Sequence, residues 1–150
     1  MPLNSVQIST LLSTRKPMTD LTRGVLDTSV VIDHDKIDVA QLPEEFAITA
    51  VTLAELAAGP HATENRDERA RRQDRLQWAA TTWDPLPFDA ESARMYGRMF
   101  AAARSVGQSS RTRLADLLIA STAAANELPL YTRNPSDFSA LKHILTVIKV

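Results

Sequence analysis

The chain has 150 residues, of which 44% are hydrophobic and 23% charged, with a formal net charge of -1. These values are typical of one globular domain with a substantial core. They exclude a globally basic nucleic-acid-binding protein, so any binding of nucleic acid must depend on local charge or on metal ions. The sequence has no cysteine, which excludes disulfides and thiolate metal sites.

Residues 1–22 are rich in Ser, Thr and other polar residues, and this composition predicts a poorly ordered extension before a domain at 23–150. The short apolar patch at 8–12 precedes the nearest basic residues, which is the wrong order for a signal peptide. No apolar run is long enough to span a membrane. We therefore expect no membrane contact and a cytoplasmic location.

The first half of the domain is expected to alternate strands with helices. Val25 and Leu26 favour a strand, and Thr28 and Ser29 are good helix N-caps. The expected strands are 25–26 and 46–49, and the expected helices are 29–34, 50–58 and 64–79. The second helix has Thr49 or Thr52 as its cap and ends at a Gly-Pro pair, and the third mixes charges of both signs, as a solvated helix does.

The second half begins with a Pro-broken segment, 83–88, suited at most to an edge strand. Asp89 or Ser92 is expected to cap a helix that runs to about 105, and its apolar stripe is typical of core or of subunit contact. The elements expected after it are a helix at 114–126, a strand at 130–132, a turn at 134–137 and a strand at 144–150. This alternation predicts an α/β fold, with a central, mainly parallel sheet flanked by helices.

Asp27 follows the first predicted strand directly. The carboxyl ends of strands are where ligand sites collect in open α/β sheets. An Asp in this position is also a common helix cap, and taken alone that interpretation is favoured for Asp27. A functional assignment therefore depends on acids elsewhere in the chain.

Glu55 and Asp116 are each the only charge in a long apolar helical segment, 48–58 and 114–125. A carboxylate buried without a partner costs several kcal/mol, about enough to force it to neutralise. No cation lies one helical turn from Glu55, so a group outside the helix must satisfy it. Asp116 has the alternative of a favourable place in the first helical turn.

Asp137 follows the strand at 130–132, in a turn where an acid is commonplace. If the strands before Asp27 and Asp137 are neighbours, the four acids can converge at one edge of the sheet. Carboxylates without basic partners repel one another unless protons or cations intervene. Oxygen ligands without Cys or His favour Mg²⁺ or Mn²⁺, and such a site suits the hydrolysis of phosphate esters.

Four short blocks of the sequence resemble the signature blocks of PIN-domain ribonucleases, and most closely those of the VapC toxins of bacterial toxin–antitoxin pairs. They occur in family order between Gly24 and Val150. The blocks are Leu26-Asp27-Thr28-Ser29-Val30, Thr52-Leu53-Ala54-Glu55-Leu56, Asp116-Leu117-Leu118-Ile119-Ala120 and Thr132-Arg133-Asn134-Pro135-Ser136-Asp137-Phe138.

The resemblance implies a Mg²⁺- or Mn²⁺-dependent endoribonuclease in which these acids bind the metal. Asp27 and Asp116 would be direct ligands, whereas Glu55 and Asp137 would bind directly or through water. The positions that would support the site are Thr28, Thr132 and Asn134. The candidate contacts to RNA phosphates are Arg111, Arg113 and Arg133, for which a role as ordinary surface arginines is about as well supported.

The resemblance further implies a homodimer held inactive by a small VapB-like antitoxin, in a heterotetramer or larger assembly. The substrate would be structured RNA, such as tRNA or rRNA, cut in exposed single-stranded loops. Two related alternatives stay open: a housekeeping PIN nuclease without an antitoxin, and a catalytically silent module that binds a partner or RNA. Phosphoaspartate chemistry is disfavoured, because the haloacid-dehalogenase pattern needs an acid where Ser29 stands.

Overall fold

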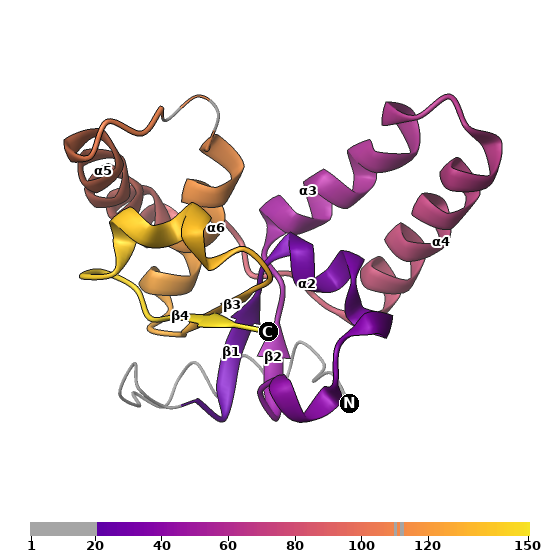
Figure 1. Cartoon of the computed structure of the whole chain (residues 1–150), viewed down its shortest axis with the longest axis horizontal. Helices are drawn as coiled ribbons and strands as arrows, with labels where there is room; N and C mark the ends of the chain where they lie inside the picture. The colour runs from indigo at the N-terminus through magenta and orange to yellow at the C-terminus, as the bar shows by residue number, and fades with distance from the viewer. Residues whose placement is uncertain (1–20, 110, 112) are drawn as a thin grey trace.

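Four parallel strands form the centre of the structure, a computed structural model that describes residues 21–109, 111 and 113–150. The strand order is β2-β1-β3-β4. The strands are β1 (Arg23–Leu26), β2 (Glu45–Ala47), β3 (Leu130–Thr132) and β4 (Val147–Lys149). Helices lie around this sheet (Figure 1), so the predicted α/β fold is confirmed. The predicted extension lies mostly outside the described residues.

Strand β1 lies between β2 and β3 in the sheet, and both of its faces are covered. All four of its residues are buried, as expected for a parallel strand between two neighbours. Val25 and Leu130 belong to one apolar cluster, whereas Leu26 and Tyr131 belong to the cluster on the other side. Successive residues of a strand point to opposite faces, and these short apolar runs therefore build both halves of the core.

Helices α5 (Ala90–Ser105) and α6 (Leu114–Ala125) pack together on one side of the sheet (Figure 1). Met99 of α5 and Ala120 and Ala123 of α6 are completely buried in the same cluster as Val25. The stripe of apolar residues predicted for α5 is thus part of the core. Small alanines let α6 approach α5 closely, and this fixes the position of the first turn of α6.

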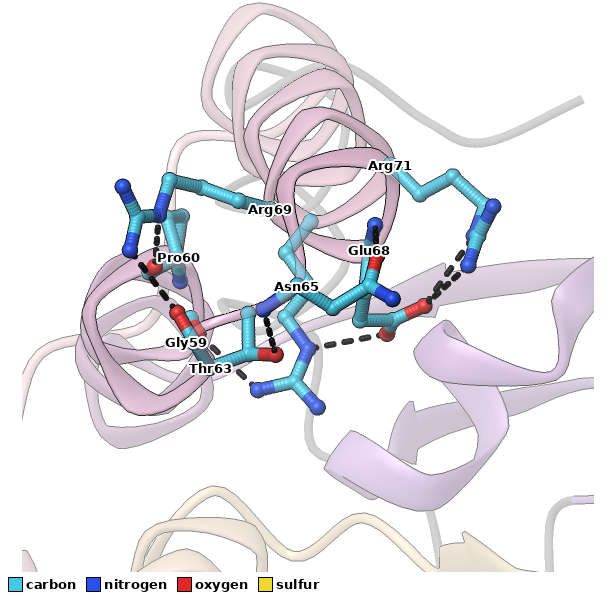
Figure 2. Close-up of polar contacts among 8 residues, drawn as sticks. Gly59, Pro60, Thr63, Asn65, Glu68, Arg69 and Arg71 are labelled. Atoms are coloured by element: carbon cyan, nitrogen blue, oxygen red, sulfur yellow. Dashed lines mark hydrogen bonds and ion pairs between the residues drawn. The ribbon is translucent and has the colours of Figure 1, made fainter.

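On the other side, α2 (Thr28–Ile32) follows β1 and lies beside α3 (Ala50–Ala58) and α4 (Arg66–Thr82). A short turn, η3 (Gly59–Ala62), connects α3 to α4. Arginines of α4 hold this corner (Figure 2): Arg72 donates to the carbonyl of Gly59 at 2.9 Å, and Arg69 donates to those of Pro60 and Thr63 at 3.2 and 2.9 Å. These bonds fix α4 relative to α3.

Several predicted boundaries were wrong by a few residues. Strand β2 ends at Ala47 rather than at residue 49, because Thr49 caps α3 by accepting a hydrogen bond from the N–H of Thr52 at 3.1 Å. The Pro-broken segment makes only an isolated parallel bridge, between Leu86 and Thr49. Helix α2 ends at Ile32, two residues before the predicted end, and β4 begins three residues after the predicted start.

Short 3-10 turns occupy segments expected to be loops or turns: η1 (His34–Lys36), η2 (Val39–Gln41) and η4 (Pro135–Leu141). The caps expected for α3 and α5 are confirmed, with Asp89 accepting from the N–H of Ser92 at 2.9 Å. Within the described ranges, every helix is too short or too polar to cross a membrane.

Candidate active site

The four acids predicted to act together come from four separate elements. Asp27 directly follows β1, Glu55 lies on α3, Asp116 lies in the first turn of α6, and Asp137 lies in η4 just after β3. Strands β1 and β3 are parallel neighbours, with Val25 opposite Leu130. Asp27 and Asp137 therefore leave the sheet at the same edge, which was the condition for convergence.

The electrostatics of Asp116 show that the acids are close enough to interact. Burial, which is the largest cause, and the negative charges of Asp27, Asp137 and Glu55 together raise the pKa of the Asp116 carboxyl to about 6, while Arg113 opposes them. Like charges that share a site disfavour ionisation in this way. Asp116 thus combines partial burial with an acidic neighbourhood, which is the signature of a site that gains from a bound cation.

Asp27 is buried, with 5% of its surface exposed, and two hydroxyls hold one of its oxygens. Ser29 Oγ and Thr132 Oγ1 both donate to Asp27 Oδ2 at 2.8 Å. Asp27 occupies the N-cap position of α2, yet its side chain makes no capping bond. In the described part of the chain no donor bonds Oδ1, so this oxygen is available to a ligand.

The hydroxyls that hold Asp27 are themselves fixed by the backbone after β3. Thr132 Oγ1 accepts from the N–H of Asn134 at 3.1 Å, and Ser29 Oγ accepts from the N–H of Arg133 at 3.1 Å. Asn134 therefore contacts this network through its backbone, with its side chain exposed. Ser29 serves Asp27 and does not cap α2, contrary to what its position suggested.

Glu55 is more exposed than the sequence suggested. Its isolation among apolar residues suggested burial, but Glu55 is exposed, because that side of α3 faces a cavity and solvent. The expected partner from outside the helix is present: Thr28 Oγ1 donates to Glu55 Oε1 at 2.7 Å. Thr28 Oγ1 also lies 2.9 Å from Thr52 Oγ1, so α2 and α3 meet through hydroxyls.

Arg113 is the cation closest to the acids. One of its guanidinium nitrogens lies 2.7 Å from Asp137 Oδ1 and 3.7 Å from Asp116 Oδ2, and the hydrogen bond to Asp137 and the nearby charges raise the pKa of Arg113. Arg133 instead faces Asp33, at 3.6 Å, and Arg111 is exposed. From the sequence, Arg113 was a candidate phosphate contact or an ordinary surface arginine, and its ion pair with Asp137 was not predicted.

A cavity of about 590 Å³ extends from Thr28 and Glu55 towards α4. The wall contributed by α4 consists of four charged residues: Glu68, Arg71, Arg72 and Arg75. Arg71 and Arg72 both bind Glu68, at 2.8 and 2.9 Å, which leaves this wall with an excess of positive charge. The sequence of α4 suggested a nearly neutral solvated helix. Helical spacing alone could not show which of its arginines face the cavity.

The donor set fits a hard divalent cation. The charges of Asp27, Asp137 and Glu55 add to burial in raising the pKa of the Asp116 carboxyl, and a bound cation would offset this repulsion. The sequence has no cysteine, and carboxylate oxygens are the ligands that Mg²⁺ and Mn²⁺ prefer. Within the described ranges, no three acids or histidines already surround one point. Arg113 holds Asp137 instead, so an ion would have to displace this pairing.

Comparisons with known proteins identify the family of the chain. The PIN domain family model matches residues 24–144. The chain is 41% identical over 121 residues to Ribonuclease VapC5 of Mycobacterium tuberculosis, which covers 79% of this chain and 87% of that protein. It is 36% identical over 101 residues to Ribonuclease VapC8 of the same organism, covering 67% of this chain and 89% of the relative.

Solved structures agree as well. VapBC-5 of Mycobacterium tuberculosis, described as a member of the VapBC family of toxin-antitoxin systems, matches with a TM-score of 0.74 and 39% identity, over 86% of this chain and 98% of that one. VapBC2 of Rickettsia felis matches with a TM-score of 0.64 over 85% and 98%, and at 22% identity it supports the fold alone. The resemblance drawn from the four sequence blocks is confirmed: the chain belongs to the PIN-domain family, among its VapC members.

Proposed function

We propose that this protein is the toxin of a toxin–antitoxin pair, a Mg²⁺- or Mn²⁺-dependent endoribonuclease. The observation that carries the proposal is the effect of three other acids, Asp27, Asp137 and Glu55, on Asp116, whose carboxyl pKa burial and these charges raise to about 6. The names of the relatives support the same class, since Ribonuclease VapC5 and Ribonuclease VapC8 share the fold-forming part of the chain.

Asp27 and Asp116 are the proposed direct ligands of the metal, and Glu55 and Asp137 bind it directly or through water. Bound metal would polarise the phosphoryl group, lower the pKa of a water molecule and stabilise the leaving oxygen. The remaining chemistry belongs to the chain. Thr132 holds Asp27 at a fixed angle, and Thr28 orients the carboxylate of Glu55. Asn134 supports the contact between Thr132 and Asp27 through its backbone N–H, which donates to Thr132 Oγ1.

The proposed substrate is a single-stranded loop of a structured RNA such as tRNA or rRNA. The unstacked nucleotides of such a loop can reach the acids at the edge of the sheet. Arg111, Arg113 and Arg133 are the proposed phosphate contacts on the side of α6 and β3. Arg113 would exchange Asp137 for a phosphate when RNA and metal are bound. Arginine suits this exchange because its planar fork binds carboxylates and phosphates in the same way.

The proposed partner is a small VapB-like antitoxin, bound to a homodimer of the toxin in the cytoplasm. The solved neighbours from Mycobacterium tuberculosis and Rickettsia felis are described as VapBC assemblies. A guanidinium from such a partner could neutralise the acids as Arg113 does. Helix α3 also favours partner binding, because three of its apolar residues, Ala54, Ala57 and Ala58, are exposed and could be covered by a partner.

The test is expression of the wild type and of Asp116→Ala in a growing bacterium, with RNA 5′ ends mapped after induction. The wild type is expected to arrest growth and to create new 5′ ends at few positions, and Asp116→Ala to do neither. Asp84→Ala, which removes an exposed acid outside the site, is the control. Growth arrest of equal strength from wild type and Asp116→Ala would sink the catalytic assignment.

The genetic neighbourhood separates a toxin from a housekeeping nuclease. A small open reading frame directly upstream is expected to encode a protein that binds the purified toxin and stops cleavage. A nuclease that cuts RNA but has no such neighbour would be a housekeeping enzyme. Binding of RNA without any cut by the wild type would identify a silent module instead.

A further inference from the structure

A second cavity, of about 330 Å³, adjoins the one at the candidate active site. Both are lined by Ile32, Asp35 and Arg75, so they share a border. The second cavity is completed mainly by His34 and Trp78. The proposed metal chemistry gives neither aromatic residue a role, so the second cavity could serve another ligand.

Trp78 presents an exposed ring, and the half-buried ring of His34 lies beside it at an interplanar angle of 57°. The rings of His34 and Trp78 lie 5.2 Å apart, and Trp78 is 36% exposed. On its other side Trp78 packs edge-on against the buried Trp83, with ring centroids 4.9 Å apart. The contact with Trp83 therefore restrains the Trp78 ring, which lines the cavity and keeps part of its surface exposed. Aromatic rings with an open face are the usual platforms on which the bases of single-stranded nucleic acids stack.

Arg75 lies where the two cavities meet. In the described part of the chain it has no hydrogen bond or ion pair, unlike Arg71 and Arg72, which bind Glu68. A guanidinium without an acidic partner is well suited to bind a phosphate. Together with the excess of positive charge on this wall of α4, Arg75 marks a path for a phosphate between the two cavities.

The charges inside the second cavity select the part of the nucleotide that enters it. Asp74 lines this cavity and not the first one, and its carboxylate would repel a phosphate that entered past the border. An uncharged base meets no such penalty and gains contact with Trp78. We propose that this cavity is a subsite for one unpaired base of the RNA substrate, with the adjoining phosphate on Arg75. The inference rests on the proposed ribonuclease function and adds a subsite to it.

The first experiment compares cleavage of a short single-stranded oligoribonucleotide by the wild type, Trp78→Leu, Trp78→Phe and Arg75→Ala. A base that stacks equally in the bound substrate and in the transition state changes KM and leaves kcat alone. Trp78→Leu is expected to raise KM roughly 5- to 100-fold with kcat within about 2-fold, and Trp78→Phe to retain most of the affinity. Arg75→Ala is expected to raise KM and to weaken the salt dependence of binding.

Two controls exclude trivial causes. Arg98→Ala removes an exposed arginine of α5 that lines neither cavity, and its KM should equal that of the wild type. Thermal melting shows whether each variant folds, because Trp78 also supports Trp83. If Trp78→Leu does not fold, His34→Ala and Arg75→Ala carry the same test.

The second experiment needs no variant of doubtful stability. Affinity is measured by fluorescence anisotropy in EDTA, so that the RNA stays intact, for a set of oligoribonucleotides that each lack one base. The wild type is expected to lose affinity at one position of the set, and Trp78→Phe to show the same position. In Trp78→Leu the missing base at that position should make no difference.

Equal KM in Trp78→Leu and wild type, or no position at which a missing base matters, would overturn the proposal. So would unchanged RNA affinity in Trp78→Leu combined with lost binding of the neighbouring antitoxin, since the cavity would then hold a side chain of that protein. Failure of the wild type to cut RNA would instead refute the ribonuclease proposal, and the anisotropy experiment would still decide the base subsite.

Discussion

Arg113 lies 2.7 Å from Asp137 and 3.7 Å from Asp116, so one guanidinium bridges two acids that come from separate elements, η4 and α6. The chain thus supplies its own cation where a divalent metal is proposed to bind. This single contact links the charge balance of the free protein to both the proposed metal and the proposed RNA contact.

Replacement of Arg113 by Ala should therefore act in two directions. Without the competing cation, the affinity for Mn²⁺ measured by calorimetry is expected to rise about 5-fold, as removal of one nearby charge implies. RNA cleavage is expected to fall about 10-fold or more in kcat/KM, because a phosphate contact is lost. Arg104→Ala, which removes an exposed arginine of α5, should change neither value. A parallel loss of both properties would show that Arg113 serves only to hold the fold.

Replacement of Asp27 by Asn should abolish the response to metal. A ligand that binds only the folded state raises its stability by about 1.4 kcal/mol at ten times its dissociation constant, and the wild type should melt several degrees higher in millimolar Mn²⁺ or Mg²⁺. Asp27→Asn is expected to lose this gain, whereas Asp38→Asn, at the exposed N-cap of η2, should keep it. A gain of the same size in Asp27→Asn would refute Asp27 as a ligand.

Thr132 is completely buried, and its hydroxyl both donates to Asp27 and accepts from the N–H of Asn134. Thr132→Val keeps the shape of the side chain and removes both bonds. Because buried groups lose their partners, the free energy of unfolding should fall by about 1–3 kcal/mol in a urea titration, and cleavage should slow. Thr132→Ser restores the hydroxyl and should recover most of the activity. If Ser behaves like Val at this position, the methyl group rather than the hydroxyl is what matters.

Asp116 should make the metal-free protein less stable as the pH rises. Its pKa is about 6 in the folded state, against 3.8 as the ordinary value, so between these values the folded protein binds more protons than the unfolded one. Stability then falls with increasing pH through this window and stays low above it. In EDTA, Asp116→Asn is expected to be more stable than wild type by about 1–3 kcal/mol near pH 7.5, with little difference near pH 4. The same pH dependence in both proteins would contradict the shift.

Gly24 should tolerate no side chain, because a Cβ there would lie 2.5 Å from Cε1 of the Tyr131 ring. The ring is buried and its hydroxyl donates to the carbonyl of Leu21 at 2.8 Å, so it has little room to move. Gly24→Ala is expected to cost about 1–3 kcal/mol of unfolding free energy. Gly97→Ala is the matched comparison: nothing lies within 4 Å, and alanine in helix α5 should stabilise by about 0.5–1 kcal/mol.

The sequence sufficed to identify the elements that carry the acids. Apolar runs that end at Asp27 and before Asp137 predicted two strands, and their pairing as parallel neighbours is confirmed. The exposure of Glu55 could not be predicted in this way. An apolar helix is usually buried, but the composition of α3 does not reveal that one of its sides lacks a cover within this chain.

The platform of Trp78 and the free guanidinium of Arg75 could not be predicted either. Both lie in a helix whose charges nearly cancel in sequence, and only the angle between α3 and α4 decides which arginines meet the site. That angle depends on side-chain bonds to backbone carbonyls at the corner, such as that of Arg72 to Gly59. Periodicity contains no information about such bonds.

The hydrogen bond between Thr132 and Asp27 joins residues that are 105 positions apart. Because β1 is flanked by β3, the pocket around Asp27 cannot close until the last part of the chain has left the ribosome. Nascent chains of this protein should therefore be inert, and the interval between completion of synthesis and formation of the β1–β3 pair gives a neighbouring antitoxin time to meet its target before the first RNA is cut.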